Sequence, residues 1–246
     1  MSESLIQTSS LDKFYGKKQV LHQINVTIPK NKVTVLLGPS GSGKSTLIRT
    51  FNGLENFSSG EINIFGQTIA PRNNKQWKSI QTRIGMVFQS YDLFPNMTVM
   101  KNILLGPLKV QKRSREEVVE KAKKLLSEVG LSEYENAYPR QLSGGQKQRV
   151  AIVRALILNP ELMLFDEVTA SLDPEMVRGI LDILKNLANK NLTMVIVTHE
   201  MNFARQVGNK VIFLENGRVV EQGDGATFFT HPTTKRAEAF LESMSF

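Results

Sequence analysis

Stretches of uninterrupted apolar residues alternate along the chain with stretches of helical periodicity. Four apolar runs have the length and composition of strands that are buried on both faces, namely 33–37, 162–165, 194–197 and 211–214. Residues 177–187 between two of these runs place apolar side chains on one side of a helix. Because strands of this kind pair in parallel between layers of helices, we predict an α/β fold with a mostly parallel sheet flanked by helices.

Two shorter segments depart from this pattern. Residues 20–28 and 60–66 alternate apolar and polar positions, which is typical of half-buried antiparallel strands. We therefore expect an antiparallel β subdomain near the N-terminus, added to the parallel core.

The middle of the chain has helical periodicity. Ser114 and Glu117 have the spacing of a capping box at the start of one helix, which Gly130 would end. We expect a single domain over 1–246, in which 1–89 and 160–246 form the core and 90–159 form an inserted helical lobe.

Charge and composition exclude few further classes of protein. The net charge is +8, but the basic residues are scattered in pairs, which favours solvated faces over a nucleic-acid surface. The chain has no cysteine, no apolar run long enough for a membrane helix and no secretory signal pattern at its N-terminus. We expect it to stay in the compartment where it is made.

The strongest chemical signal follows the first buried strand, at 33–37. There the sequence reads Gly38-Pro39-Ser40-Gly41-Ser42-Gly43-Lys44-Ser45, and a helical segment begins with Thr46. This is the phosphate-binding P-loop pattern in the strand–turn–helix setting that it requires. Glycines let backbone N–H groups turn towards an anion, Lys44 can reach the outer phosphates, and the Ser45 hydroxyl can ligate Mg²⁺. We therefore predict a nucleotide-binding site.

Polar residues also follow other predicted strands. Asp166 and Glu167 end the strand 162–165, where an aspartate can hold Mg²⁺ and a glutamate can accept a proton from water. Gln89 ends the run 84–88 and could ligate the metal, although a polar residue at a strand end is ordinary. His199 either donates a hydrogen bond to a γ-phosphate or is a structural histidine.

A second helix start is suited to an anion. Leu142-Ser143-Gly144-Gly145-Gln146 opens a helix with a serine and two glycines, which is either an anion site or a plain N-cap and turn.

Taken together, these motifs resemble those of ATP-binding-cassette (ABC) ATPases, in the same order and over the whole chain. The P-loop, Gln89 as the Q-loop residue, the LSGGQ signature at 142–146, the Walker B strand ending at Asp166, and the D-loop 171–173 all match. The resemblance implies that ATP and Mg²⁺ are the cofactors. It also implies that Tyr15 stacks on adenine. The other implied residues of the nucleotide site are Gly38, Pro39, Ser40, Gly41, Ser42, Gly43, Lys44, Ser45, Thr46, Gln89, Asp166, Ser143, Gly144, Gly145, Gln146 and Asp173.

Roles within this site are also implied by the resemblance. Glu167, His199 and Lys44 would be catalytic, and Ser45, Gln89 and Asp166 would ligate Mg²⁺. Two copies of the chain would enclose two ATP molecules head to tail, so that the signature loop of one copy closes on the γ-phosphate held by the other.

A subfamily resemblance suggests what the ATPase serves. Residues 89–99, Gly106-Pro107 and 237–241 resemble bacterial importers of polar amino acids. This implies membrane permease partners contacted near Tyr91, Leu93 and Phe94, an extracytoplasmic solute-binding protein, and a place on the cytoplasmic face of the membrane. Packing of the loop onto the helical lobe is the alternative explanation for these apolar residues.

The sequence departs from the family at the residues after Glu167. Val168 replaces the usual proline, and Ala170-Ser171 are in swapped order. We expect a looser turn and altered rates at most. A non-transport ABC ATPase in cluster assembly or cell division, and a nucleic-acid binder, remain alternatives at this point.

Overall fold

The computed structural model describes residues 3–71, 74–170 and 172–244, and the chain divides into two compact units. The first unit comprises Met1–Gln81 and Lys190–Phe246, and the second comprises Thr82–Asn189. The helical lobe expected at 90–159 lies within the second unit, which also takes in the segments on either side of it. The division of the domain into a core (1–89 and 160–246) and a helical lobe (90–159) stays a prediction.

The parallel strands of the first unit are those predicted from its apolar runs. β4 (Val33–Leu37), β9 (Thr193–Val197) and β10 (Lys210–Glu215) are parallel, and β11 (Arg218–Asp224) pairs antiparallel with β10, in the order β11-β10-β4-β9. Every residue of β4 and β9 is buried. The tight turn at Asn216 and Gly217 has positive φ at both residues, as its sequence requires.

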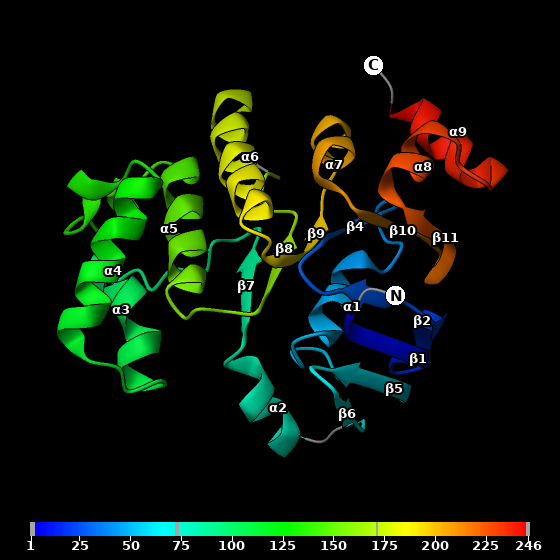
Figure 1. Cartoon of the computed structure of the whole chain (residues 1–246), viewed down its shortest axis with the longest axis horizontal. Helices are drawn as coiled ribbons and strands as arrows, with labels where there is room; N and C mark the ends of the chain where they lie inside the picture. Colours follow the sequence, from blue (N-terminus) through cyan, green and yellow to red (C-terminus); the bar gives the residue numbers. More distant parts are fainter. Residues whose placement is uncertain (1–2, 72–73, 171, 245–246) are drawn as a thin grey trace. The chain divides into compact units, whose positions relative to one another are not determined.

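Helices cover both faces of these strands. Figure 1 shows α1 (Lys44–Thr50) on one side and α7 (Met201–Val207), α8 (Gly225–Thr230) and α9 (Lys235–Ser243) on the other. The last two helices pack through aromatic contacts, since the Phe213 ring lies 6.2 Å from Phe228 and 4.9 Å from Phe240, centroid to centroid. The α/β class with a mostly parallel sheet and flanking helices is therefore confirmed.

The antiparallel subdomain is confirmed in the same unit. Its strands are β1 (Ser4–Tyr15), β2 (Lys18–Ile24), β3 (Thr27–Pro29), β5 (Ser59–Ile64) and β6 (Gln67–Ile69), and α2 (Asn74–Gln81) follows them. The expected single strand over 20–28 is two strands. Thr8 explains the break, because its hydroxyl donates to the carbonyl of Ile24 at 2.9 Å and accepts from the N–H of Val26 at 3.0 Å. These backbone groups are thus bound by a side chain and not by a strand ladder.

The second unit contains one parallel strand pair and a helical group. β7 (Ile84–Phe88) pairs with β8 (Leu162–Asp166). The helices are α3 (Val99–Lys109), α4 (Arg115–Glu128), α5 (Gly144–Leu156) and α6 (Pro174–Asn189), with short 3₁₀ turns at Ser132–Tyr134 and Pro139–Gln141. Figure 1 shows α3, α4 and α5 together, and their apolar faces form a common core.

The capping box predicted at Ser114 is wrong, although α4 does begin directly after it. The Ser114 hydroxyl makes no cap hydrogen bond and instead contacts the Glu116 carboxylate at 3.5 Å. Glu117, the expected partner, is bound by the Arg113 guanidinium at 2.6 Å. A charge-assisted bond to arginine is stronger than a bond to a neutral backbone amide, which explains why the box does not form.

None of the helices in the described part of the chain has both the length and the apolar character needed to cross a bilayer.

Candidate nucleotide-binding site

The P-loop has a backbone that side chains other than glycine would disrupt. Gly38 leaves β4 with φ +144°, and a Cβ atom there would lie 2.0 Å from the carbonyl oxygen of Leu214. Gly43 precedes α1 with φ +102°, and its Cβ would lie 2.8 Å from Leu21. The loop is pinned to the β10–β11 turn by a hydrogen bond from the N–H of Gly217 to the carbonyl of Ser42. Strand, turn and helix therefore follow one another as predicted.

The polar side chains of this loop suit a phosphate group. Lys44 is only 4% exposed, and its ammonium donates to the carbonyls of Gly38 at 2.8 Å and Pro39 at 3.0 Å. Ser42 has a buried hydroxyl with no hydrogen-bond partner among the described residues. A buried donor of this kind is costly unless a ligand satisfies it. The loop therefore places a positive charge and an unsatisfied hydroxyl where a phosphate would supply acceptors.

His199 lies at the same strand edge as the P-loop. It follows β9 by two residues, and β9 and β4 are parallel neighbours in which Val197 pairs with Leu36. Because the carboxyl ends of parallel strands meet at one edge, His199 and Gly38 leave the sheet side by side. The His199 side chain is exposed. Its role at a γ-phosphate stays a prediction.

Tyr15 ends β1 in the same unit and is 45% exposed. Burial and a hydrogen bond to Glu55 raise the pKa of its phenol, so the side chain is neutral at physiological pH. Its ring therefore has the exposure and the neutral aromatic surface that a base-stacking residue needs.

The second unit brings the acidic residues and the Q-loop together. Phe88 at the end of β7 pairs with Asp166 at the end of β8, so Gln89 and Glu167 leave neighbouring strands at one edge. Asp166 is buried, Glu167 is half-buried and Gln89 is exposed. The roles of these residues in holding a metal and positioning water stay predictions.

Glu167 has an unusual backbone. Its φ is +50°, a left-handed conformation that is rare for residues other than glycine and is often found at functional sites. The turn after it is closed by a hydrogen bond from the N–H of Ala170 to the carbonyl of Glu167, and Val168 is buried. Asp173 is exposed and precedes α6. Ser171, one of the two swapped residues, lies outside the described residues.

The signature motif forms a complete capping box at the start of α5. The Ser143 hydroxyl accepts from the N–H of Gln146, and the Gln146 amide oxygen accepts from the N–H of Ser143. The two glycines are needed for packing, since a Cβ on Gly144 would lie 3.0 Å from the Tyr91 hydroxyl and one on Gly145 would lie 3.0 Å from Met176. The signature therefore packs directly against the loop that follows Gln89.

Two residues that hold this loop were missed by sequence reasoning. Arg154 on α5 donates to the carbonyls of Asp92 at 2.6 Å and Tyr91 at 3.1 Å, two residues with positive φ. Asn102 is fully buried on α3; it accepts from the N–H of Phe94 and donates to the carbonyls of Phe94, Met97 and Thr98. Neither residue belongs to a motif, and only their polarity within apolar helical stretches marked them.

The predicted site residues are divided between the two units. Tyr15, the P-loop and His199 belong to the first, whereas Gln89, the signature, Asp166, Glu167 and Asp173 belong to the second. No group of three histidine, aspartate or glutamate side chains that could hold a metal is found in the described ranges. The predicted Mg²⁺ ligands are a hydroxyl, an amide and one carboxylate, a set of oxygen donors that Mg²⁺ uses together with phosphate oxygens.

The fold and the loop define a P-loop nucleotide-binding ATPase. Residues 21–170 match the family model described as ABC transporter, and the chain belongs to this family. It is an ABC ATPase that binds and hydrolyses ATP.

Similar proteins cover nearly the whole chain. It is 50% identical over 237 residues to the glutamate transport ATP-binding protein GluA of Corynebacterium efficiens, covering 96% of this chain and 98% of that protein. It is 48% identical over 240 residues to the arginine transport ATP-binding protein ArtM of Bacillus subtilis, covering 98% and 100%. The glutamate/aspartate import ATP-binding protein GltL of Escherichia coli is 48% identical over 237 residues, covering 96% and 98%.

Solved structures show the same fold. The dimeric structure of MJ0796, a bacterial ABC transporter cassette, has a TM-score of 0.80 and 34% identity, covering 89% of this chain and 98% of that one. A dimeric post-hydrolysis state of the same cassette, bound to ADP and Pi, has the same TM-score, identity and coverage.

Proposed function

We propose that this chain is the ATPase subunit of an importer of polar amino acids and works as a head-to-tail pair of copies around two ATP molecules. The observation that carries the proposal is that one chain contains two loops suited to binding phosphate. One is the P-loop with buried Lys44, and the other is the capped helix start at Ser143. The relatives named for glutamate, arginine and glutamate/aspartate transport support the amino-acid class.

The chemistry assigned to each residue follows from its place. Lys44 and the backbone N–H groups of the P-loop bind the outer phosphates, while Ser45, Gln89 and Asp166 would hold Mg²⁺. Bound Mg²⁺ would neutralise charge that develops on the phosphate oxygens. Glu167 accepts the proton of the attacking water, and the exposed His199 side chain donates a hydrogen bond to the γ-phosphate.

The second copy completes each site. Ser143 and the N–H groups that begin α5 would contact the γ-phosphate held by the partner copy, which a single chain does not supply to itself. The dimeric MJ0796 cassette supports this arrangement. The isolated chain is then a slow ATPase, and ATP binding favours the closed pair.

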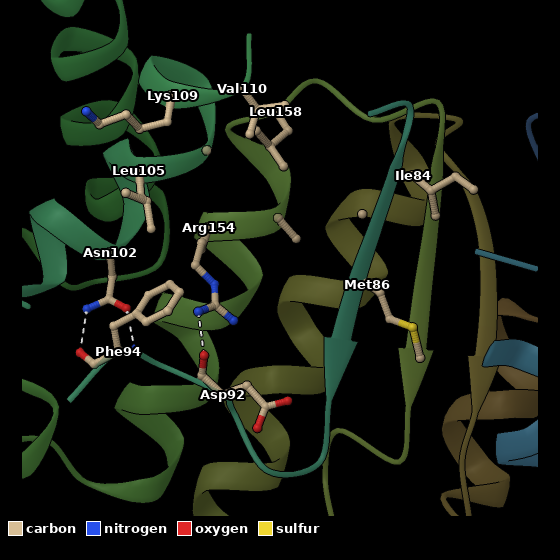
Figure 2. Close-up of a pocket in the computed structure, with 13 residues that line it drawn as sticks. Ile84, Met86, Asp92, Phe94, Asn102, Leu105, Lys109, Val110, Arg154 and Leu158 are labelled. Atoms are coloured by element: carbon tan, nitrogen blue, oxygen red, sulfur yellow. Dashed lines mark hydrogen bonds between the residues drawn. The ribbon is translucent and has the colours of Figure 1, made fainter. Parts of the chain in front are cut away.

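A groove in the second unit supports the proposed permease contact near Tyr91–Phe94. A cavity of about 640 Å³ is lined by residues of β7, α3, α5 and the loop between β7 and α3 (Figure 2). Phe94 is 46% exposed at this cavity, whereas Leu93 packs against the helical core. Packing onto the helical lobe accounts for Leu93, and we assign the permease contact to the exposed Phe94.

The charged groups of this groove support a permease segment with an acidic residue as its occupant. Arg154 and Lys109 line it together with one carboxylate, Asp92. Burial lowers the pKa of Arg154, which is held by two backbone carbonyls. A permease segment with apolar side chains and an acidic residue would complement these groups. We place the assembly on the cytoplasmic face of the membrane, with a solute-binding protein on the other side.

Reconstitution with the permease tests the proposed function. Purified chain is expected to hydrolyse ATP slowly, and addition of the permease in liposomes with a loaded solute-binding protein is expected to stimulate the rate at least about tenfold. The measurement is phosphate release with and without each component. Stimulation by a soluble scaffold without any permease would instead favour a non-transport ABC ATPase.

Replacing Phe94 with serine is expected to weaken permease binding. An exposed aromatic that lines a groove contributes about 2 kcal/mol or more when a partner buries it, so affinity should fall roughly 30-fold. Co-purification of the permease with the tagged chain gives the readout, and thermal unfolding checks the fold. Leu54→Ser, which alters an exposed apolar residue of the other unit, is the matched control. Equal permease capture by the Phe94 variant and the control would remove Phe94 from the interface.

A further inference from the structure

The buried ammonium of Lys13 lies between Tyr15 and the segment after α1. It donates to the Glu55 carboxylate at 2.9 Å and to the carbonyl of Asn56 at 2.7 Å, and it lies 4.4 Å from the centroid of the Tyr15 ring. The ammonium therefore has two oxygen partners and also makes a cation–π contact with the ring. One face of the Tyr15 ring is therefore covered by a cation.

Glu55 also acts on the hydroxyl at the end of the same ring. Burial and the nearby Glu55 carboxylate raise the pKa of the Tyr15 phenol. Although burial acts to raise the pKa of Glu55, the hydrogen bonds from Lys13 and Tyr15 outweigh it and lower that pKa, so the carboxylate stays ionised. Glu55 thus pairs with the cation over the ring and acts electrostatically on the hydroxyl at its end.

The contact with the buried Lys13 ammonium restrains the plane of an exposed ring. Tyr15 is 45% exposed, and an exposed aromatic at a strand end would otherwise rotate about its side-chain bonds. The ring is therefore restrained before any ligand arrives, which reduces the entropy lost on binding.

We propose that Glu55 and Lys13 are positioning residues for Tyr15, and that they present one face of its ring to the base of the nucleotide. The proposal rests on the base-stacking role of Tyr15 in the proposed function. It adds two residues outside the P-loop, Q-loop and signature motifs, and it assigns them to recognition of the base and not of the phosphates.

A comparison of two ligands separates base recognition from phosphate recognition. Binding of ATP and of inorganic tripolyphosphate, each with Mg²⁺, is measured by calorimetry on the full chain and on Glu55→Gln. We expect ATP affinity to fall about three- to tenfold because part of the stacking is lost, with tripolyphosphate affinity unchanged. Lys13→Met is expected to give the same pattern. Glu61→Gln, an exposed glutamate on β5, is the matched control.

A spectroscopic readout reports the contact itself. Glu55→Gln removes the negative charge that helps to raise the pKa of Tyr15, so that pKa should fall. Ultraviolet titration of the phenols, with Tyr15→Phe identifying the signal of Tyr15, measures the change. A merely structural role of Glu55 would lower thermal stability without this selective change.

The outcomes distinguish this proposal from the function on which it rests. Tyr15→Ala should weaken ATP and spare tripolyphosphate. If it does so while Glu55→Gln changes neither ATP affinity nor the phenol pKa, the positioning role is overturned and the stacking role stands. If Glu55→Gln weakens both ligands equally, Glu55 acts on the fold and the proposal is again overturned. If Tyr15→Ala leaves ATP affinity unchanged, the stacking role itself is wrong, and the positioning role falls with it.

Discussion

Replacement of Glu167 by glutamine is expected to reduce steady-state ATP turnover by roughly 10²- to 10⁴-fold, the range over which general-base groups contribute. Glutamine keeps the size and the hydrogen-bonding oxygen of the side chain but does not accept a proton at neutral pH. Phosphate release measured at saturating ATP, in the assembled transporter and in the isolated chain, gives the effect.

Nucleotide binding should survive this substitution. Glu167 belongs to the second unit, and Lys44 with the P-loop belongs to the first, so the phosphate-binding groups are untouched. Because hydrolysis ends the closed state, the variant should accumulate as an ATP-bound pair, visible as a doubling of mass by light scattering. Glu120→Gln, an exposed glutamate on α4, is the matched control. Turnover at the parental rate in the Glu167 variant would remove Glu167 from the chemistry.

The backbone of Glu167 is held in a strained conformation. Its left-handed φ costs of order 1–3 kcal/mol, and the Ala170–Glu167 turn and buried Val168 hold it in place. A proline at 168, usual in the resembled family, was expected to make a tighter turn. The buried valine contributes packing instead, and so the turn is held by burial where proline would hold it by ring geometry.

Local pattern predicted those parts of the fold that local physics determines. The buried strands β4, β8, β9 and β10 follow from uninterrupted apolar runs, because such runs are stable only between two layers. The P-loop and the signature were also predictable, since positive φ and helix caps restrict which residues fit. The turn at Asn216 and Gly217 follows the same rule, since both residues have positive φ.

Contacts between distant residues were not predictable from one sequence. Arg154 lies 62 residues from the Asp92 carbonyl that it binds, and Lys13 lies 43 residues from Asn56. Long polar side chains make such contacts only after the fold brings their partners near, and the local sequence does not identify those partners. The capping box at Ser114 failed for a related reason, because Arg113 competes for Glu117 with a charged bond.

Removal of the Lys44 ammonium, in Lys44→Ala, is expected to weaken nucleotide binding by about 100-fold or more. The ammonium is buried in the P-loop, where it donates to two carbonyls and would meet the phosphate oxygens. Charge-assisted hydrogen bonds contribute about 1.5–3 kcal/mol each, and phosphate accepts more than one. Calorimetric titration with ATP and with tripolyphosphate measures the loss, which should be equal for both because Lys44 contacts no base.

Thermal unfolding separates lost binding from lost folding in this variant. A ligand present at 100 times its dissociation constant stabilises the folded state by about 2.7 kcal/mol, so Mg²⁺-ATP should raise the parental unfolding temperature by several degrees. Without nucleotide, the Lys44 variant should unfold near the parental temperature, since alanine leaves no charge buried. With nucleotide, the Lys44 variant should show no rise in unfolding temperature. The control variant Lys17→Ala, altered in an exposed turn, should show the parental rise. A full shift in the Lys44 variant would show that phosphate binding depends on other groups of the loop.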